Sequence, residues 1–591
     1  MHNILLFIID SLNYSHVKES PINLMPYLSE IKKAGLYCEN MYSQAPYTEA
    51  AVMNLYCGDN VLQNGGYLFR FKNAPMTIFE AMQSYGYITY FNSFQPQCYP
   101  SSLRRGIEYL YYNVGFDQSA LWSYRLAHYA SLYKNNKLLN NDYRTISMLL
   151  EDNFIEWITF LDNIENNDKS IDMIKNNSSS YDAKSIKTAV EREHACFYKN
   201  SKKYIVDIFK QGQKHPFFTI PTFHQFNKIK DPNTISAIKQ TFRPLLKRIR
   251  SMNIKLNYKN NNLLRGPFRK FLSMIKDPRV TTSKEFAKSV YLAINTLYDF
   301  DLYKRVDQNC DRFKNAPSGR THIDHYINWA INQNPEQPYF ACVHIDDIHN
   351  PEIFFSYDSP DIKLVQKEAH DAKKLLDEIP SDYRGSITHD LSLRYIDNVI
   401  HYLYNQLKTH NLLNTTYVLI CADHGFSFSG NPLRDSFVTN LYLENYNIPF
   451  IITGPDIKHK EISKLCSSKD IPATICKLAT GSIPREFSGH SVFDDFEYSN
   501  IVIEYCGGGC PDISRRELKI AAFTKDYFVG TLCKLHTPLN DGAITEIYDL
   551  RNDPKQLKNL AFKTYDKDKV MPLIHAIEQR REEILITNPI V

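Results

Sequence analysis

The chain has 591 residues and a net charge of +4, with 43% hydrophobic and 23% charged residues. This length exceeds what one hydrophobic core usually needs, so we expect one large domain with elaborations, or two to three domains. The nearly balanced charge gives no reason to expect a nucleic-acid partner. No stretch approaches the roughly 18 apolar residues of a membrane span, and residues 1–13 lack the basic start and cleavage site of a signal peptide.

The twelve cysteines are scattered along the chain, many of them inside apolar runs. Buried reduced thiols explain this distribution more simply than a disulfide framework, and they favour a cytoplasmic protein. The close pair Cys506 and Cys510 is a weak metal or redox signal, because no companion ligands accompany it.

Residues 1–118 alternate between strand and helix patterns. The run "NILLFII" (3–9) is continuously apolar, as is typical of a parallel strand covered on both faces. Helical spacing follows at 25–35 and 77–86, and a further strand pattern at 87–93. This order predicts the first part of an open α/β catalytic core.

Residues 119–315 form a predicted insertion that is mostly helical. Between Lys228 and Arg279 it contains eight Lys and six Arg against two Asp, a net charge of +12, so the rest of the chain carries −8. Apolar residues interleave with these cations. The tract 228–279 therefore suits an amphipathic helix lying on the anionic inner face of a membrane or holding an anionic substrate, and it equally suits a solvated helix face.

The α/β pattern returns at residues 316–500, which we assign to the second part of the core. Helices are expected at 321–333 and 391–413, and strands at 338–345, 415–422 and 448–454. Residues 501–591 read as a smaller C-terminal α+β subdomain that ends in a helix at 571–585.

Two of the apolar strands run directly into charged side chains. Asp10 follows the strand 3–9, and Asp423 and His424 follow the strand 415–422. Ligands of open α/β sheets bind beyond the carboxyl ends of parallel strands. A divalent cation such as Zn²⁺, Mn²⁺ or Mg²⁺ would reconcile two carboxylates and an imidazole at this edge. The alternative is that Asp10 caps the next helix and that "DHG" is a plain turn.

Thr48 is a candidate nucleophile. It stands at the entry to a short helix, where free N–H groups favour anions such as phosphate. A hydroxyl that also contacts a metal can ionise near neutral pH and attack phosphorus. The alternative is a simple N-cap.

These motifs, in this order, resemble the sulfatase-like branch of the alkaline-phosphatase superfamily. The resemblance rests on "NILLFIIDSLN", "SQAPYT", "QPYFACVHIDDIHNP", "YVLICADHG" and "EIYDLRNDPKQLKNLA", and it covers most of the chain outside the insertion. It implies an α/β sandwich with a mostly parallel sheet. It also implies one metal held by Asp10, Thr48, Asp423 and His424, with His349 touching the phosphoryl group.

The chain departs from sulfatases at the nucleophile. They oxidise a cysteine or serine to formylglycine within a C/S-x-P-x-R motif, whereas this chain has Thr48 without that Pro and Arg. Their second N-terminal aspartate is here Ser11. Threonine is the nucleophile in relatives that transfer phosphoethanolamine or phosphoglycerol and in nucleotide phosphodiesterases. The resemblance thus implies a phosphodiester donor and a glycan or lipid hydroxyl acceptor; a hydrolase using water and an inactive binding protein are alternatives.

A second metal or substrate site is a further alternative. Its candidate ligands cluster at the end of strand 338–345 and in one later loop: His344, Asp346, Asp347, His349 and His490. His224 resembles His349 in its surroundings, and we assign it to the insertion. Histidines at such positions are more often structural.

Overall fold

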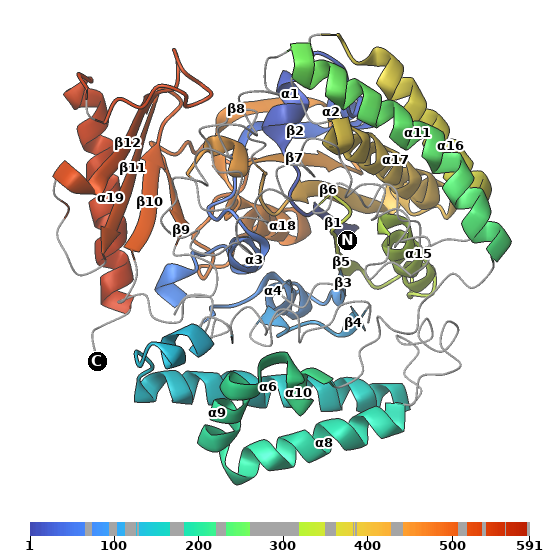
Figure 1. Cartoon of the computed structure of the whole chain (residues 1–591). Coiled ribbons are helices and arrows are strands. Elements are labelled where there is room, and N and C mark those ends of the chain that lie inside the picture. The colour runs from blue at the N-terminus through green and yellow to red at the C-terminus, as the bar shows by residue number, and fades with distance from the viewer. Residues whose placement is uncertain are drawn as a thin grey trace.

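The structure of this chain is a computed structural model. It describes residues 1–64, 74–93, 98, 103–112, 126, 129–165, 183–219, 232–259, 318–348, 362–381, 383, 387–426, 441–505, 517–534, 539, 541–561 and 563–587. A large sheet with helices on both faces forms the centre of the molecule, and a group of helices and a smaller sheet lie beside it (Figure 1).

The central sheet has eight strands in the order β4-β3-β5-β1-β6-β7-β2-β8. The strands are β1 (Asn3–Ile9), β2 (Leu36–Tyr42), β3 (Ile88–Ser93), β4 (Tyr109–Tyr112), β5 (Tyr339–Ile345), β6 (Thr416–Ala422), β7 (Asn447–Thr453) and β8 (Lys460–Ser467). Only β7 among these runs antiparallel to both of its neighbours, and all other pairs are parallel. The predicted α/β class with a mostly parallel sheet is confirmed.

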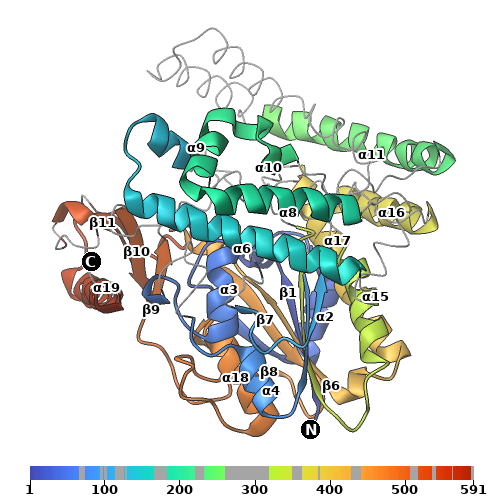
Figure 2. The ribbon, with the colours of Figure 1, turned by 90° about the horizontal axis from the view of Figure 1, so that it is seen from below.

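Helices cover both faces of this sheet. The helices α3 (Thr48–Cys57), α4 (Ile78–Ser84) and α18 (Asp470–Thr480) pack on one another on one face. On the other face α17 (Ile387–Thr409) contacts α2 (Pro26–Ala34), α15 (Gly319–Ala330) and α16 (Ile362–Glu378) (Figures 1 and 2). The short helix α1 (Tyr14–Glu19) directly follows β1 and its loop.

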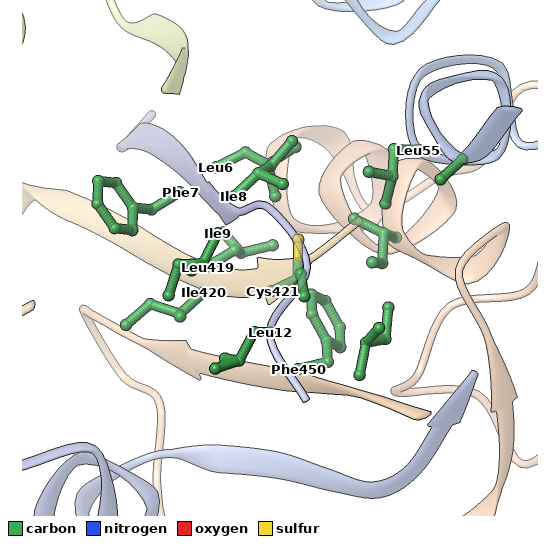
Figure 3. Close-up of a cluster of buried hydrophobic side chains, with 14 of the residues drawn as sticks. Leu6, Phe7, Ile8, Ile9, Leu12, Leu55, Leu419, Ile420, Cys421 and Phe450 are labelled. Carbon is green, nitrogen blue, oxygen red and sulfur yellow. The ribbon is translucent and has the colours of Figure 1, made fainter. Parts of the chain in front are cut away.

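The core lies between the sheet and these helices. Residues 4–9 of β1 are completely buried, which explains why this strand is apolar without alternation. Figure 3 shows side chains of β1, β6 and β7 packed together, with Leu12 beyond the end of β1 and Leu55 of α3 nearby. This packing fixes the ends of β1 and β6 side by side.

Side chains distant in sequence define where some helices begin. The carboxylate of Asp397 in α17 accepts the N–H groups of Tyr27 and Leu28 at 2.9 and 2.8 Å, so it caps α2 from a neighbouring helix. In α4 the cap is local, because Thr77 and Glu80 form a capping box.

Four helices between residues 140 and 219 have a hydrophobic core of their own. They are α6 (Asn140–Glu165), α8 (Ala183–Lys199), α9 (Ser201–Gln211) and α10 (Pro216–Thr219). Phe154, Phe197 and Phe217 are central to this core, which is separate from the main one. Both views show α6 and α8 side by side (Figures 1 and 2).

The basic tract contains one described helix, α11 (Pro232–Lys259), which packs on α16. Its apolar side chains Ile238, Phe242 and Ile249 belong to the main core. Its seven cations are not offset by any acid within the helix, and Arg243 and Lys247 are exposed. The apolar face of α11 is therefore used for folding, and the charged face points outward. Tract residues 228–231 and 260–279 lie outside the described residues.

The C-terminal residues form a second sheet and a long helix at one side of the molecule (Figure 1). The sheet is antiparallel, in the order β12-β11-β10-β9. Its strands are β9 (Ile501–Tyr505), β10 (Glu517–Phe523), β11 (Tyr527–Lys534) and β12 (Ile544–Asp549), and α19 (Lys567–Thr587) packs across them. Arg580 of α19 donates from Nε to Glu504 Oε2 of β9 at 2.8 Å, and both side chains are buried.

Among the described residues, the remaining elements are five short 3-10 turns: η1 (Leu62–Asn64), η6 (Gly212–Lys214), η9 (Leu413–Thr415), η10 (Leu443–Asn445) and η12 (Asp541–Ala543). Within the described part of the chain, no helix combines the length and apolarity that crossing a bilayer requires. The pair Cys506 and Cys510 lies outside the described residues.

Candidate active site and metal centre

Three neighbouring strands bring acidic and imidazole side chains to one edge of the central sheet. In the sheet, β1 lies between β5 and β6 and is parallel to both. Asp10 directly follows β1, Asp423 directly follows β6, and His344 is the penultimate residue of β5. All three are buried.

Ser11 fixes the orientation of both carboxylates. Its amide donates to Asp423 Oδ1 at 3.0 Å, and its hydroxyl donates to Asp10 Oδ1 at 2.6 Å. Asp423 Oδ1 also accepts the backbone N–H of His424 at 2.7 Å. Ser11 achieves this geometry with φ at +61°, a left-handed conformation that costs a serine about 1 kcal/mol. The Oδ2 atoms of the two aspartates face the other groups of the site: Thr48 lies near that of Asp10, and His344 and His424 lie near that of Asp423.

Thr48 reaches the same point from the loop after β2. Its Oγ1 donates to Asp10 Oδ2 at 3.2 Å and lies 3.4 Å from His424 Nε2. The N-cap of α3 is Tyr47, and Thr48 is the first helical residue. The alternative that Thr48 is a simple N-cap is therefore wrong. Its hydroxyl donates to the carboxylate of Asp10, which follows β1.

The tautomer of His424 follows from its partners. Nδ1 lies 2.7 Å from the carbonyl oxygen of Gly425, which can only accept, so Nδ1 carries the proton. The lone pair of the neutral ring is then on Nε2, which lies 3.6 Å from Asp423 Oδ2 and 3.7 Å from Asp10 Oδ1. Gly425 permits this approach, since a Cβ there would lie 2.2 Å from the carbonyl oxygen of Glu444.

His344 joins the cluster from β5. Its Nε2 lies 3.7 Å from Asp423 Oδ2. Among the described residues neither nitrogen of this buried ring has a hydrogen-bond partner, and neither does Asp423 Oδ2. Each such orphaned polar group costs about 1–3 kcal/mol. Burial lowers the pKa of His344, and the charges of Asp423 and Asp10 partly oppose this.

These observations fit a divalent cation. Ligand atoms of Asp10, His344 and Asp423 all lie within 4.8 Å of one another. Two buried carboxylates repel each other unless a cation joins them, and a buried imidazole without a partner needs a ligand for its lone pair. The site combines oxygen and nitrogen donors, as metal centres of enzymes often do.

The sulfatase family pattern matches residues 2–225 and 272–482, which is more than half of the chain. The chain belongs to the sulfatase family. Enzymes of this family use a metal ion, in agreement with the cluster described above.

Individual relatives are distant from this sulfatase-family chain. The Δ4,5-hexuronate-2-O-sulfatase of Bacteroides thetaiotaomicron is 27% identical over 180 residues, covering 28% of this chain and 34% of that protein. Arylsulfatase K of Xenopus laevis is 26% identical over 176 residues, covering 29% of this chain and 32% of that protein. The matched segments span about a third to a half of the curated relatives.

Among solved structures, the phosphonate monoester hydrolase of Agrobacterium radiobacter aligns with a TM-score of 0.46 and 12% identity. The alignment covers 99% of this chain and 96% of that one.

Other predicted ligands of this sulfatase-family chain have different surroundings. Asp347 Oδ1 accepts the N–H of Gly319 at 3.1 Å, so it stabilises the start of α15. The ring of His490 stacks on Phe496 with centroids 3.6 Å apart. Asp346 is buried, two residues after His344. His349 and His224 lie outside the described residues, so the roles of these two stay predictions.

The sequence did not single out Cys98. Burial raises the pKa of its thiol, and the charges of Asp10, Asp423 and Asp346 act in the same direction. Its one sequence signal is its position: it follows β3, the strand next to β5.

Proposed function

We propose that this chain is a metal-dependent phosphotransferase that acts on phosphodiesters through a phospho-threonine intermediate. The observation that carries the proposal is the position of Thr48 Oγ1, 3.2 Å from Asp10 Oδ2 and 3.4 Å from His424 Nε2. A hydroxyl held by a carboxylate and an imidazole at the start of a helix is placed to attack an anionic phosphorus centre.

Threonine chemistry supports phosphoryl over sulfuryl transfer. Formylglycine is an aldehyde at Cβ, and the Cβ of Thr48 carries a methyl group, so its oxidation would give a ketone. The Pro and Arg of the formylglycine maturation motif are also absent. Thr48 must therefore act as a hydroxyl if it acts at all.

Asp10, Thr48, Asp423 and His424 would hold the metal. A bound divalent cation would lower the pKa of a hydroxyl and neutralise charge on phosphate oxygens. Among the residues themselves, Ser11 keeps Asp10 oriented so that its Oδ2 receives the hydroxyl of Thr48.

The reaction then has two balanced halves. In the first, Asp10 accepts the proton of Thr48 while the Oγ1–P bond forms, the bond to the leaving alcohol breaks, and that oxygen takes a proton; His349 is our candidate donor. In the second, an acceptor hydroxyl gives its proton to His349 while its oxygen forms the new O–P bond, the Oγ1–P bond breaks, and Thr48 recovers its proton from Asp10. The N-terminus of α3 stabilises the negative charge in both halves.

We further propose that the transferred group is of the phosphoethanolamine or phosphoglycerol kind and that the acceptor is a glycan or a lipid-linked sugar. This step rests on the family resemblance alone.

The second candidate is a phosphodiesterase or phosphatase of the same site that uses water as acceptor. The relatives with assigned names are sulfatases, which are hydrolases, and this favours water. A third candidate, an inactive binding protein, has the presence of Asp10, Thr48, Asp423 and His424 against it.

The test compares Thr48→Val, which keeps the shape and removes the hydroxyl, with Thr48→Ser, which keeps the hydroxyl. Metal-loaded protein is given an aryl phosphodiester and, separately, an aryl sulfate, and the intact protein mass is recorded. We expect a phosphoryl adduct on the wild type and on Thr48→Ser. In Thr48→Val we expect no adduct and a loss of activity of about 1,000-fold or more.

Full activity in Thr48→Val would end this proposal, and so would preferential cleavage of the aryl sulfate. Adding a polyol or a glycoside as acceptor separates the two enzyme candidates. A new phosphodiester product indicates the transferase, and a phosphomonoester formed regardless of acceptor indicates the hydrolase.

A further inference from the structure

We propose that His344 is a ligand of the metal centre and that the two imidazoles of His344 and His424 make this centre selective for Zn²⁺ over Mg²⁺ and Ca²⁺. This proposal concerns binding alone, so it does not depend on the group that Thr48 attacks.

His344 is buried without a described partner. Its ring is 1% exposed, and neither nitrogen has a hydrogen-bond partner among the described residues. Most buried histidines satisfy at least their N–H group. His322 is one example in this chain, since it is equally buried and its Nδ1 contacts Asn92 Oδ1 at 2.6 Å.

His344 faces an acceptor that is also unsatisfied. This acceptor is Asp423 Oδ2, which has no hydrogen-bond partner among the described residues. Their separation of 3.7 Å is too long for a hydrogen bond. In the described part of the chain, His344 and Asp423 Oδ2 both lack a hydrogen-bond partner and face each other at this distance, and a ligand atom of Asp10 lies within 4.8 Å of both residues. This arrangement indicates a metal ion that all three residues bind.

The donor atoms of the site have the spacing of metal ligands. His344 Nε2 and His424 Nε2 lie 3.7 and 3.6 Å from Asp423 Oδ2, and His424 Nε2 lies 3.7 Å from Asp10 Oδ1. Bonds of about 2.0–2.1 Å to a tetrahedral Zn²⁺ place ligand atoms about 3.3 Å apart. Octahedral Mg²⁺, with similar bond lengths, would bring neighbouring ligands to about 2.9 Å.

Ser11 holds both carboxylates of the site. Its hydroxyl donates to Asp10 Oδ1 at 2.6 Å and lies 3.5 Å from His424 Nε2, and its amide donates to Asp423 Oδ1. His344 adds an imidazole nitrogen as a donor, because β5 lies directly beside β1 and carries this residue near its end. Two imidazoles and two carboxylates suit Zn²⁺, whereas Mg²⁺ and Ca²⁺ prefer oxygen donors alone.

The experiment measures binding to the full-length apo protein. Zn²⁺ and Mg²⁺ affinities are determined by titration calorimetry for the wild type, for His344→Gln and for the control His194→Gln. The control removes a histidine of α8 that contacts Glu151 of α6. Co²⁺ absorption of each protein reports the coordination number and the nitrogen donors.

We expect His344→Gln to bind Zn²⁺ about 100-fold more weakly, to bind Mg²⁺ with little change, and to shift the Co²⁺ spectrum. His194→Gln should match the wild type. Unchanged Zn²⁺ affinity and Co²⁺ spectrum in a folded His344→Gln would overturn the proposal.

X-ray absorption on the Zn²⁺-loaded wild type provides a readout that needs no variant. Two imidazoles in the first coordination sphere support the proposal, and a single one overturns it. Neither measurement involves turnover, so their outcome is separate from that of the phosphotransferase proposal.

Discussion

The backbone N–H of Ser11 donates to Oδ1 of Asp423 at 3.0 Å, although the two residues are 412 positions apart. The hydroxyl of the same serine holds Asp10. One residue in a left-handed conformation thus couples the ends of two parallel strands. This arrangement makes Ser11 a positioning residue whose contribution can be measured.

Replacing Ser11 separates the hydroxyl from the backbone conformation. Both Ser11→Ala and Ser11→Gly remove the bond to Asp10, so we expect each to weaken metal binding by about 10- to 100-fold. Glycine adopts positive φ at no cost, so Ser11→Gly should unfold with a free energy about 1 kcal/mol higher than Ser11→Ala. Metal titration and denaturant unfolding measure the two effects; equal metal affinity in Ser11→Ala and wild type would contradict the positioning role.

The buried ion pair of Arg580 and Glu504 attaches α19 to the C-terminal sheet. Arg580→Met leaves Glu504 buried and uncompensated, so we expect a loss of about 3–5 kcal/mol in unfolding free energy. The double variant with Glu504→Met removes both charges and should recover most of that loss.

Denaturant unfolding of the single and double variants checks this coupling. Lys525→Met is the control, because Lys525 lies between β10 and β11 of the same sheet and the change removes only an exposed pair with Glu497, and it should change little. A double variant as unstable as the sum of the two single variants would show that the pair is not coupled.

We expect the free energy of unfolding to depend on pH through the titration of His325. The ring stacks on Tyr111 with centroids 4.1 Å apart, and Nε2 lies 2.9 Å from the tyrosine hydroxyl. Burial lowers the pKa of His325 to about 4, against about 6.5 in an unfolded chain. Between these values the unfolded state binds a proton that the folded state excludes. Stability is therefore present above pH ~6.5 and falls as the pH decreases to ~4, by at most about 3 kcal/mol.

His325→Phe keeps the stacked ring and removes the titration. The loss of unfolding free energy between about pH 7 and about pH 4.5 should then be smaller in this variant than in the wild type. His410→Phe, at an exposed histidine, should retain the wild-type dependence. The same slope in His325→Phe and wild type would show that another group causes it.

The charged face of α11 is predicted to bind anionic surfaces by electrostatics alone. Its apolar side chains pack in the main core, so they are not free to insert into lipid. We expect Arg243→Glu with Lys247→Glu to weaken cosedimentation with anionic vesicles about tenfold or more at low salt, since each surface cation contributes about 1 kcal/mol. Vesicles of neutral lipid should bind neither protein.

The matched control reverses two exposed lysines of another helix, Lys203 and Lys210 of α9. It changes the net charge equally. An equal loss of binding in the control would assign the effect to total charge and not to α11.

Local sequence patterns were sufficient to predict the two strands that Asp10 and Asp423 directly follow. A continuous apolar run encodes a parallel strand that is buried on both faces, and a carboxylate directly after it must lie at the carboxyl edge of the sheet. Asp10 and Asp423 could therefore be predicted as metal ligands from the sequence alone. The helical character of α17 was equally readable, because its buried side chains repeat with the helical period.

The sequence could not say which helix face meets which partner. The amphipathic pattern of α11 is compatible with a membrane surface or with another helix, because both offer an apolar surface. Packing on α16 decides this, and it depends on residues about 100 positions or more away. The role of Thr48 was ambiguous for a similar reason, since a hydroxyl at the start of a helix can bond to its own backbone or to a distant carboxylate.

The sequence by itself determined that this chain has a mostly parallel α/β sheet, with Asp10, Asp423 and His424 at its carboxyl edge. Only the tertiary structure decided that β5 lies beside β1, which brings His344 into the same cluster, and that Thr48 bonds to Asp10. Strand order follows from the packing of the whole core and not from local periodicity. Neighbours in the site that are separated by hundreds of residues therefore leave no local signal.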